Sequence, residues 1–172
     1  KELDAQKILD VGLRSAYVAS WHAARIMVPQ GSGIIAMTSS FGATCYMHGP
    51  AYGAQKAGLD KLAHDMEHDF RGTGVAAVSL WLGPQLTERA QIAAQTNPEQ
   101  YEGFLAMAEN PEFSAHVIDA INKASNRNEL SGQTLIVAEI AKELGVTDRG
   151  HERPSHRAML GNPREKNPAA VY

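Results

Sequence analysis

The sequence predicts an α/β fold, because short apolar runs with the features of buried strands alternate with amphipathic helical patterns. The run Gly33–Ser40 ends in hydroxyl side chains and Gly74–Leu82 is apolar almost throughout, which indicates two buried strands. Between them lies Tyr52–Phe70, whose apolar residues recur at helical spacing. Farther along, an amphipathic helix is predicted over Pro111–Ser125 and a third strand over Gln133–Val137.

The elements of the N-terminal part follow from the residues at their ends. A long amphipathic helix is predicted from Asp4 to about Val28, because Pro29 and Gly31 stop it. The segment Phe41–Pro50 contains glycines and a proline, and is predicted to be the loop that leads into the second helix.

The C-terminal part carries weaker signals. The segment Pro84–Asn110 is rich in Gln, Glu and Ala and predicts short helices and loops, and a short helix is predicted over Ala138–Leu144. From about Thr147 the chain is rich in Pro, Arg, Asn and His, and no regular structure is predicted there. We therefore expect part of a single domain over residues 1–150 and an irregular tail over residues 151–172.

The composition is that of an ordinary globular chain, with 172 residues of which 44% are hydrophobic. The formal net charge of −3 argues against nucleic acid or an anionic membrane as a partner. No apolar run is long enough to span a bilayer. Cys45 is the single cysteine, which excludes an internal disulfide and is consistent with a reducing compartment, so we expect a cytoplasmic protein.

The pair Tyr52 and Lys56 carries the strongest chemical signal. Residues at this spacing lie on the same face of a helix, so a phenol is predicted beside an ammonium group. A free phenol titrates at a pH of about 10, and a fixed cation nearby stabilises the phenolate. A tyrosine in that setting can donate a proton to a carbonyl oxygen or take one from an alcohol. The alternative is a chance pattern on a solvated helix face.

The order of motifs around this pair resembles the short-chain dehydrogenase/reductase family over roughly residues 5–150. The matching segments in chain order are Asp10–Ser15, Ser39-Ser40, Tyr52-x-x-x-Lys56, Gly83-x-x-x-Thr87 and Leu130–Leu135. The resemblance implies a Rossmann-type, doubly wound parallel sheet. It also implies an oxidoreductase that uses NAD or NADP and transfers a hydride to or from a small-molecule carbonyl or secondary alcohol.

The resemblance further implies roles for individual side chains. Tyr52 would be the general acid/base, and Lys56 would stabilise its phenolate and bind the ribose next to the nicotinamide. One serine of the pair would hold the substrate oxygen. We expect Ser40, because the family usually uses the second serine of the pair, although the usual spacing to the tyrosine would favour Ser39. The alternative is that both hydroxyls only cap the strand end.

Gly83 and Thr87 match the family's Pro-Gly-x-x-x-Thr motif, which contacts the nicotinamide end of the cofactor. Here Leu82 stands in the proline position and Pro84 follows the glycine, which changes the backbone N–H groups that the loop can offer. We expect Thr87 to contact the cofactor; the alternative is that it is only a helix N-cap, with Glu88 in the first turn.

Asp10 stands where the resemblance expects a fourth catalytic residue, an asparagine that supports a water chain to the lysine. An ionised carboxylate accepts hydrogen bonds but cannot donate them as an amide does, and its charge would favour the ammonium form of Lys56. We expect the water chain to Lys56 to survive, with an altered pH dependence of the reaction rate. The alternative is a solvated helix residue.

The Thr-Gly-x-x-x-Gly-x-Gly turn, with which this family cradles the cofactor pyrophosphate, is not in the sequence. We therefore expect the chain to be the C-terminal part of a longer enzyme, without the N-terminal cofactor-binding half. A sheet without its central strands has an unpaired edge, so a companion segment or another chain is expected to complete it. The alternative to an enzyme is a family-derived binding or structural protein without catalysis.

One pattern competes with the dehydrogenase interpretation. His64, Glu67 and His68 fit the His-x-x-Glu-His pattern of some zinc peptidases, but the sequence identifies neither a third ligand nor a cleft, and we expect no metal. A subunit interface or a solvated face suits these histidines better. We expect a homo-oligomer formed through the helices Asp4–Val28 and Tyr52–Phe70.

Overall fold

The computed structural model describes residues 5–167, 169 and 171. The strands are β1 (Gly33–Ser39), β2 (Val75–Trp81) and β3 (Thr134–Ile136). They form a parallel sheet in the order β1-β2-β3, in which Ser39 is level with Trp81 at the carboxyl ends. The predicted α/β fold with a parallel sheet is therefore confirmed. Among the described residues β1 forms one edge of the sheet, which is where a companion segment is expected.

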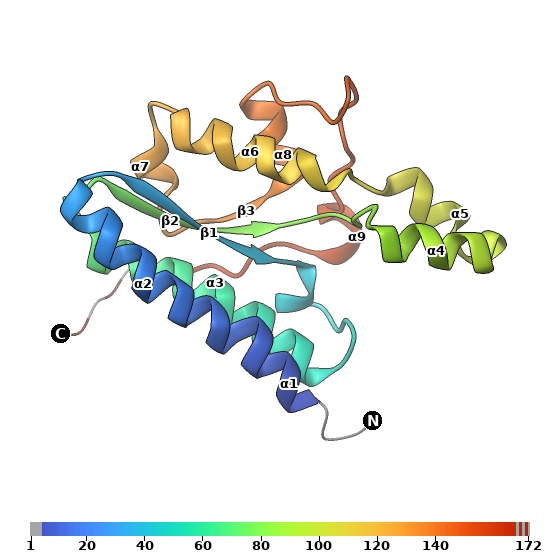
Figure 1. Cartoon of the computed structure of the whole chain (residues 1–172), viewed down its shortest axis with the longest axis horizontal. Coiled ribbons are helices and arrows are strands. Elements are labelled where there is room, and N and C mark those ends of the chain that lie inside the picture. Colours follow the sequence, from blue (N-terminus) through green and yellow to red (C-terminus); the bar gives the residue numbers. More distant parts are fainter. Residues whose placement is uncertain (1–4, 168, 170, 172) are drawn as a thin grey trace.

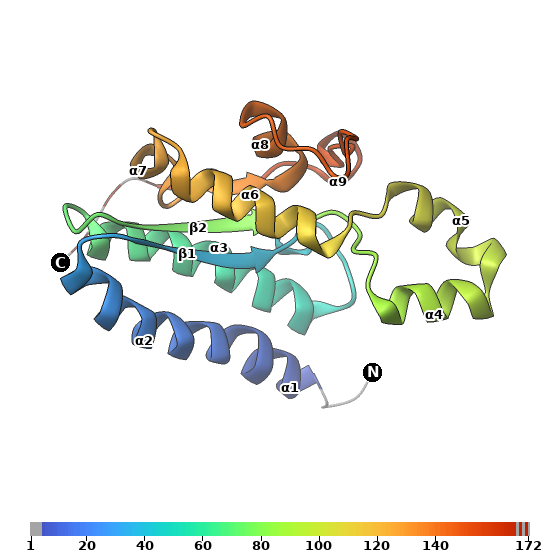
Figure 2. The same cartoon turned by 45° about the horizontal axis from the view of Figure 1, so that its top comes forward.

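Helices cover both faces of the sheet, as Figure 1 and Figure 2 show. One face carries α1 (Ala5–Leu9), a π-helical turn (Asp10–Arg14), α2 (Ser15–Gln30) and α3 (Pro50–Phe70). The other face carries α6 (Pro111–Lys123), α7 (Arg127–Leu130) and α8 (Val137–Glu143). A 3-10 turn (Phe41–Ala43) follows β1, and α9 (Arg157–Leu160) lies near the C-terminus. The helices α4 (Glu88–Thr96) and α5 (Pro98–Met107) project beyond the carboxyl end of β2 (Figure 1).

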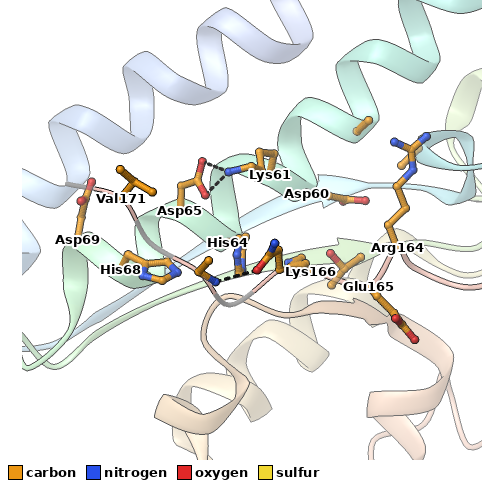
Figure 3. Close-up of a pocket in the computed structure, with 15 residues that line it drawn as sticks. Asp60, Lys61, His64, Asp65, His68, Asp69, Arg164, Glu165, Lys166 and Val171 are labelled. Carbon is orange, nitrogen blue, oxygen red and sulfur yellow. Dashed lines mark hydrogen bonds and ion pairs between the residues drawn. The ribbon is translucent and has the colours of Figure 1, made fainter.

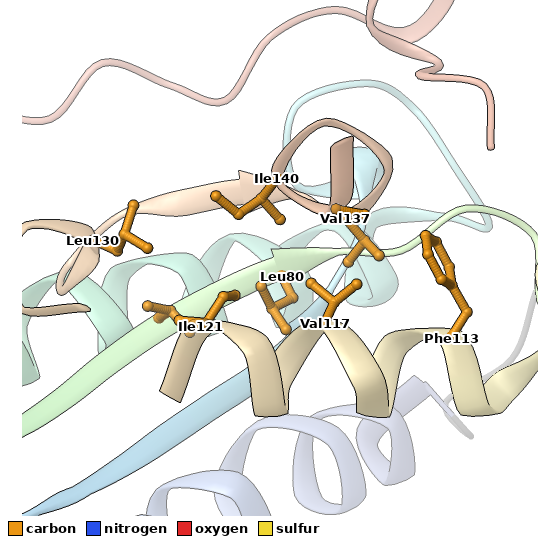
Figure 4. Close-up of a cluster of buried hydrophobic side chains, with 9 residues drawn as sticks. Leu80, Phe113, Val117, Ile121, Leu130, Val137 and Ile140 are labelled. Carbon is orange, nitrogen blue, oxygen red and sulfur yellow. The ribbon is translucent and has the colours of Figure 1, made fainter. Parts of the chain in front are cut away.

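The two longest strands differ in burial. Every residue of β2 is buried, because helices pack on both faces of this strand. Val78 and Leu80 point into a core formed with Val117 and Ile121 of α6 and with Val137 of α8 (Figure 4). Successive side chains of a strand point to opposite faces, so the residues of β2 that alternate with Val78 and Leu80 face α3 on the opposite side of the sheet. In β1, by contrast, buried and part-exposed positions alternate.

Some features of the helices were not predicted, among them the following two. The N-terminal helix is interrupted by the π-helical turn, in which a Cβ on Gly12 would lie 2.5 Å from Cδ of Gln55 on α3. Glycine at this position therefore allows close packing of the two helices. The tail also contains α9, and Leu160 of this helix packs against the cluster of Phe41 and Trp81. Within the described residues, no helix has both the length and the apolar character that a membrane crossing requires.

Candidate active site

Ser40 and Tyr52 form the centre of the candidate site. Ser40 follows β1 in an extended conformation, and its Oγ accepts a hydrogen bond from the Gly42 N–H at 3.2 Å. The same Oγ lies 3.0 Å from the Tyr52 hydroxyl. Ser39 points elsewhere, because its buried hydroxyl donates to the Lys56 carbonyl oxygen at 3.1 Å. Of the two serines that the sequence offered, Ser40 is the one that the structure brings to the phenol.

The loop before α3 holds the tyrosine against the serine. Pro50 occupies the first turn of the helix, where its missing N–H leaves no backbone acceptor unpaired. A Cβ on Gly42 would lie 2.6 Å from Cε1 of Tyr52, so the loop can approach the phenol this closely only with glycine. The His48 ring packs edge-on against the Tyr52 ring at a centroid distance of 5.0 Å. His48 has a φ of 56°, a conformation that non-glycine residues adopt mainly at tight turns or constrained sites.

Lys56 lies one helical turn after Tyr52, as the spacing predicted. Its Nζ donates to the Thr38 carbonyl oxygen at 3.0 Å and lies 5.4 Å from the centre of the Tyr52 ring. Burial lowers the pKa of Lys56, and the negative charge of Asp60 partly opposes this effect. The site therefore combines two hydroxyls and an ammonium group at the carboxyl end of β1.

The polar groups after β2 have a different arrangement. The Gly83 N–H donates to Oε2 of Glu109 at 3.2 Å, and Nε2 of Gln85 donates to the same oxygen at 2.7 Å. A Cβ on Gly83 would lie 2.5 Å from Oε1 of Glu109, so glycine is needed for this contact. Thr87 is the N-cap of α4, and its hydroxyl accepts from the Ala90 N–H at 3.2 Å. Gly83 and Thr87 thus already have hydrogen-bond partners within the protein.

Glu109 is a buried charged residue that the sequence analysis missed. It is 1% exposed, and burial raises its pKa, while the hydrogen bonds from Gln85 and Gly83 oppose that rise. Next to it, buried Asp148 accepts from the backbone and side chain of Asn110 and from Arg153. Burial opposes ionisation of Asp148, but these hydrogen bonds outweigh it and lower its pKa. Together the two carboxylates fix the base of the segment that carries α4 and α5.

Among the described residues, no hydrogen bond joins Asp10 to Ser40, Tyr52 or Lys56. Asp10 is exposed at the start of the π-helical turn and borders a shallow groove with Gly58, Lys61 and Leu62. These α3 residues lie two to six residues beyond Lys56, and the Lys56 ammonium contacts Thr38 and Tyr52 instead.

His64 and His68 border a different groove, of about 760 Å³, between α3 and the C-terminal segment (Figure 3). Their rings pack edge-on at a centroid distance of 5.4 Å. The segment that includes Arg164 and Lys166 crosses this side of α3, so the histidines do not lie on a plain solvated face. In the part of the chain that the structure describes, no three His, Cys, Asp or Glu side chains are grouped so that they could hold a metal ion.

Comparison with known families and proteins gives consistent matches. The short chain dehydrogenase family matches residues 1–98. The human protein "Dehydrogenase/reductase SDR family member 1" is 36% identical over 148 residues, which is 82% of this chain and 47% of the human protein. The chain therefore spans about half the length of this curated relative.

Solved structures share the fold. An oxidoreductase of the short chain dehydrogenase/reductase family from Burkholderia thailandensis matches with a TM-score of 0.69 and 22% identity, covering 84% of this chain and 62% of that one. A putative 2-deoxy-D-gluconate 3-dehydrogenase from Agrobacterium tumefaciens, with bound NADP, matches with a TM-score of 0.64 and 19% identity, covering 80% and 58%. At these identities the matches show that this chain shares the Rossmann-type fold of those structures.

Proposed function

This chain belongs to the short-chain dehydrogenase/reductase family, and we propose that the protein is an oxidoreductase that interconverts a small-molecule carbonyl compound and a secondary alcohol with NAD or NADP. The observation that carries this proposal is the 3.0 Å contact between the Ser40 and Tyr52 hydroxyls, with the Lys56 ammonium beside the phenol ring. A hydroxyl pair of this kind can bind one substrate oxygen from two sides.

In the proposed reaction, Tyr52 holds the proton that moves. During reduction its hydroxyl donates this proton to the substrate oxygen, and during oxidation it accepts one from the alcohol. Ser40 donates a hydrogen bond to the same oxygen and so orients the carbonyl carbon. The Lys56 ammonium stabilises negative charge on the Tyr52 oxygen. The interaction of Lys56 with the Thr38 carbonyl fixes the ammonium in this position.

The residues at the end of β1 fit the nicotinamide end of the cofactor. One of the three N–H donors of Lys56 goes to Thr38, which leaves donors for ribose hydroxyls. When bound, the dinucleotide supplies or accepts the hydride, while the protein supplies orientation and the proton. Gly83 and Thr87 are proposed to border the nicotinamide through the loop after β2. The NADP bound to the Agrobacterium relative supports a nicotinamide cofactor, with NAD and NADP both compatible.

The second candidate is a family-derived binding protein without catalysis. One observation favours it: the Gly83 N–H and the Gln85 side chain, which the loop could offer to a cofactor, already donate to Glu109. A dinucleotide would then find fewer donors at the end of β2 than at the end of β1.

We further propose that copies of the protein associate through α1, α2 and α3. Large apolar side chains are exposed on the π-helical turn and on α2, including Val11 at 72%, Tyr17 at 53% and Trp21 at 48%. The free thiol of Cys45 agrees with a cytoplasmic setting. Residues 1–150 are proposed to be part of one Rossmann-type domain, and residues 151–172 its tail.

Fluorescence titration of the full-length protein with NADH and NADPH tests the proposed function. Tight binding of either dinucleotide, with turnover of carbonyl substrates that depends on Tyr52, supports the enzyme. Binding without turnover across a panel of aldehydes, ketones and secondary alcohols supports the binding protein. The absence of dinucleotide binding would contradict the proposed oxidoreductase.

A further inference from the structure

Asp60 continues the row of functional residues on α3, one helical turn beyond Lys56. Its carboxylate accepts a hydrogen bond from Oγ of Ser79 at 2.6 Å. Its Oδ2 also accepts a hydrogen bond from Nε1 of Trp81 at 3.0 Å. Ser79 and Trp81 are fully buried on β2, on the face that points toward α3. A carboxylate at this position gives two otherwise unpaired donors of the central strand a partner.

Ser39 lies near this carboxylate and contacts the backbone of Lys56. The Ser39 hydroxyl donates to the backbone oxygen of Lys56 and packs close to Asp60. The helix is thus joined to β1 and to β2 at the turn that carries the ammonium group. Burial raises the pKa of Asp60, while the hydrogen bonds from Ser79 and Trp81 favour its ionised form.

Charge gives Asp60 a second effect on the lysine. Lys56 is partly buried, and its hydrogen-bond partner at Nζ is the neutral carbonyl of Thr38. Desolvation favours the uncharged amine, whereas the negative charge of Asp60 favours the ammonium form.

We propose that Asp60 is a positioning residue of the active site, which is anchored to β2 by Ser79 and Trp81 and keeps the Lys56 ammonium charged and in place beside Tyr52. This inference rests on the proposed oxidoreductase function, and it assigns a role to a residue that does not itself touch the substrate.

Other titratable groups also face Asp60. Lys166, on the C-terminal segment, lowers the pKa of Asp60 by its charge and donates to the Gly132 carbonyl oxygen. Arg164, His64 and Lys61 border the same groove as Asp60 (Figure 3). On the other side of Lys56, the titratable neighbour is Tyr52. A test of the inference must therefore separate the charge of Asp60 from a general change of charge along α3.

The variant Asp60→Asn removes the charge and keeps the shape, and Asp65→Asn is the matched control. Asp65 lies on the same helix but is exposed and pairs with Lys61, so the control makes the same change in net charge outside the buried network. The titration of the Lys56 amine is measured in the full-length protein without cofactor, by competitive acetylation at a series of pH values and mass spectrometry. We expect the Lys56 titration to move to lower pH by about 1 unit in Asp60→Asn and to stay at the wild-type value in Asp65→Asn. A Lys56 titration that is the same in Asp60→Asn as in the wild type would overturn the inference.

The kinetic measurement adds a readout that a purely structural role would not move. In Asp60→Asn we expect the alkaline fall of kcat to begin at lower pH, because Lys56 loses its charge earlier, while KM for the carbonyl substrate changes less than kcat. If Tyr52→Phe kept full activity, the proposed function would fail, yet the acetylation experiment would still decide whether Asp60 controls the charge of Lys56.

A second variant covers the case in which Asp60→Asn does not fold. Ser79→Ala removes one of the two side-chain anchors that hold the Asp60 carboxylate against β2, so the carboxylate keeps its charge but is held less firmly near Lys56. We expect a smaller shift of the Lys56 titration in the same direction, and an unchanged titration in a folded Ser79→Ala protein would count against the inference.

Discussion

The carboxyl ends of β1 and β2 differ in what their polar groups do. At the end of β1, the Ser40 and Tyr52 hydroxyls are half-buried and contact each other, so a substrate oxygen can replace or join that contact. At the end of β2, the Gly83 N–H and the Gln85 amide donate to buried Glu109. Under the proposed function the first set meets the substrate, whereas the second set stabilises the loop that carries α4 and α5. The chemistry of the site is therefore expected to depend on the first set and its rigidity on the second.

The largest expected effect is the loss of the Tyr52 hydroxyl. In Tyr52→Phe the ring can still pack against His48 and the loop, but the group that transfers the proton is gone. Loss of a general acid/base is expected to lower kcat by about 10²–10⁴-fold. Steady-state kinetics of the full-length protein give kcat, and circular dichroism checks the fold. A Tyr52→Phe protein within threefold of the wild type would remove the basis of the comparison.

The two neighbouring serines give the second prediction. Ser40→Ala removes a hydrogen-bond donor to the reacting oxygen, so we expect kcat to fall by about 10²–10³-fold with little change in stability. Ser39→Ala is the matched control, since its hydroxyl is buried against the Lys56 carbonyl. It should lower the free energy of unfolding by about 1 kcal/mol and affect kcat far less. Equal losses of activity in both variants would contradict the assignment of Ser40 as the substrate-binding serine.

The third prediction concerns the end of β2. Glu109→Ala leaves the Gly83 N–H and the Gln85 amide without their buried acceptor, so we expect the free energy of unfolding to fall by about 3 kcal/mol. Urea denaturation of the full-length protein measures this change. An unchanged midpoint would show that the contact contributes little to the loop.

The raised pKa of Glu109 adds a pH dependence with a definite sign. The folded state holds the proton of this carboxyl at higher pH than the unfolded state does, so stability falls as the pH rises from the ordinary glutamate value of about 4.3 through the raised value. Glu109→Gln cannot titrate and should lack this fall. The comparison of unfolding midpoints between wild type and Glu109→Gln from pH 4 to pH 7 measures the difference. If stability falls with rising pH in Glu109→Gln as much as in the wild type, another titrating group causes the fall.

The parts of the site that follow from local spacing were predictable from the sequence. The helical register that links Tyr52 to Lys56 is fixed by the geometry of one turn, and Ser40 follows directly from the end of a strand. Most strands and helices were also predicted within a few residues, because their apolar patterns are clear, but the π-helical turn, α7 and α9 were not. The spacing to Tyr52 favoured Ser39, but Ser40 is the serine that contacts the phenol. The short 3-10 turn at Phe41–Ala43 sets the path of the loop between them, and the spacing alone did not reveal this turn.

The parts that depend on long-range contacts were not predictable. Glu109 has no motif around it, and its role comes from the contact with Gly83, which is far away in the sequence. Asp60 carried a usable signal, because it continues the spacing of Tyr52 and Lys56 by one more turn. Its partners on β2 become visible only when the strand is placed against α3.

The smallest expected effect concerns Thr87, whose two interpretations make different predictions. As the N-cap of α4, its hydroxyl satisfies the Ala90 N–H, so Thr87→Ala is expected to lower the free energy of unfolding by about 1 kcal/mol. Thr87→Asn keeps a capping oxygen and should retain most of that stability. If Thr87 also binds the nicotinamide end of the cofactor, both variants should raise the dissociation constant for the dinucleotide, whereas Thr87→Ser should restore both properties. Wild-type cofactor affinity in Thr87→Ala, together with the loss of stability, would limit this residue to capping and leave the end of β2 without a cofactor contact from its side chains.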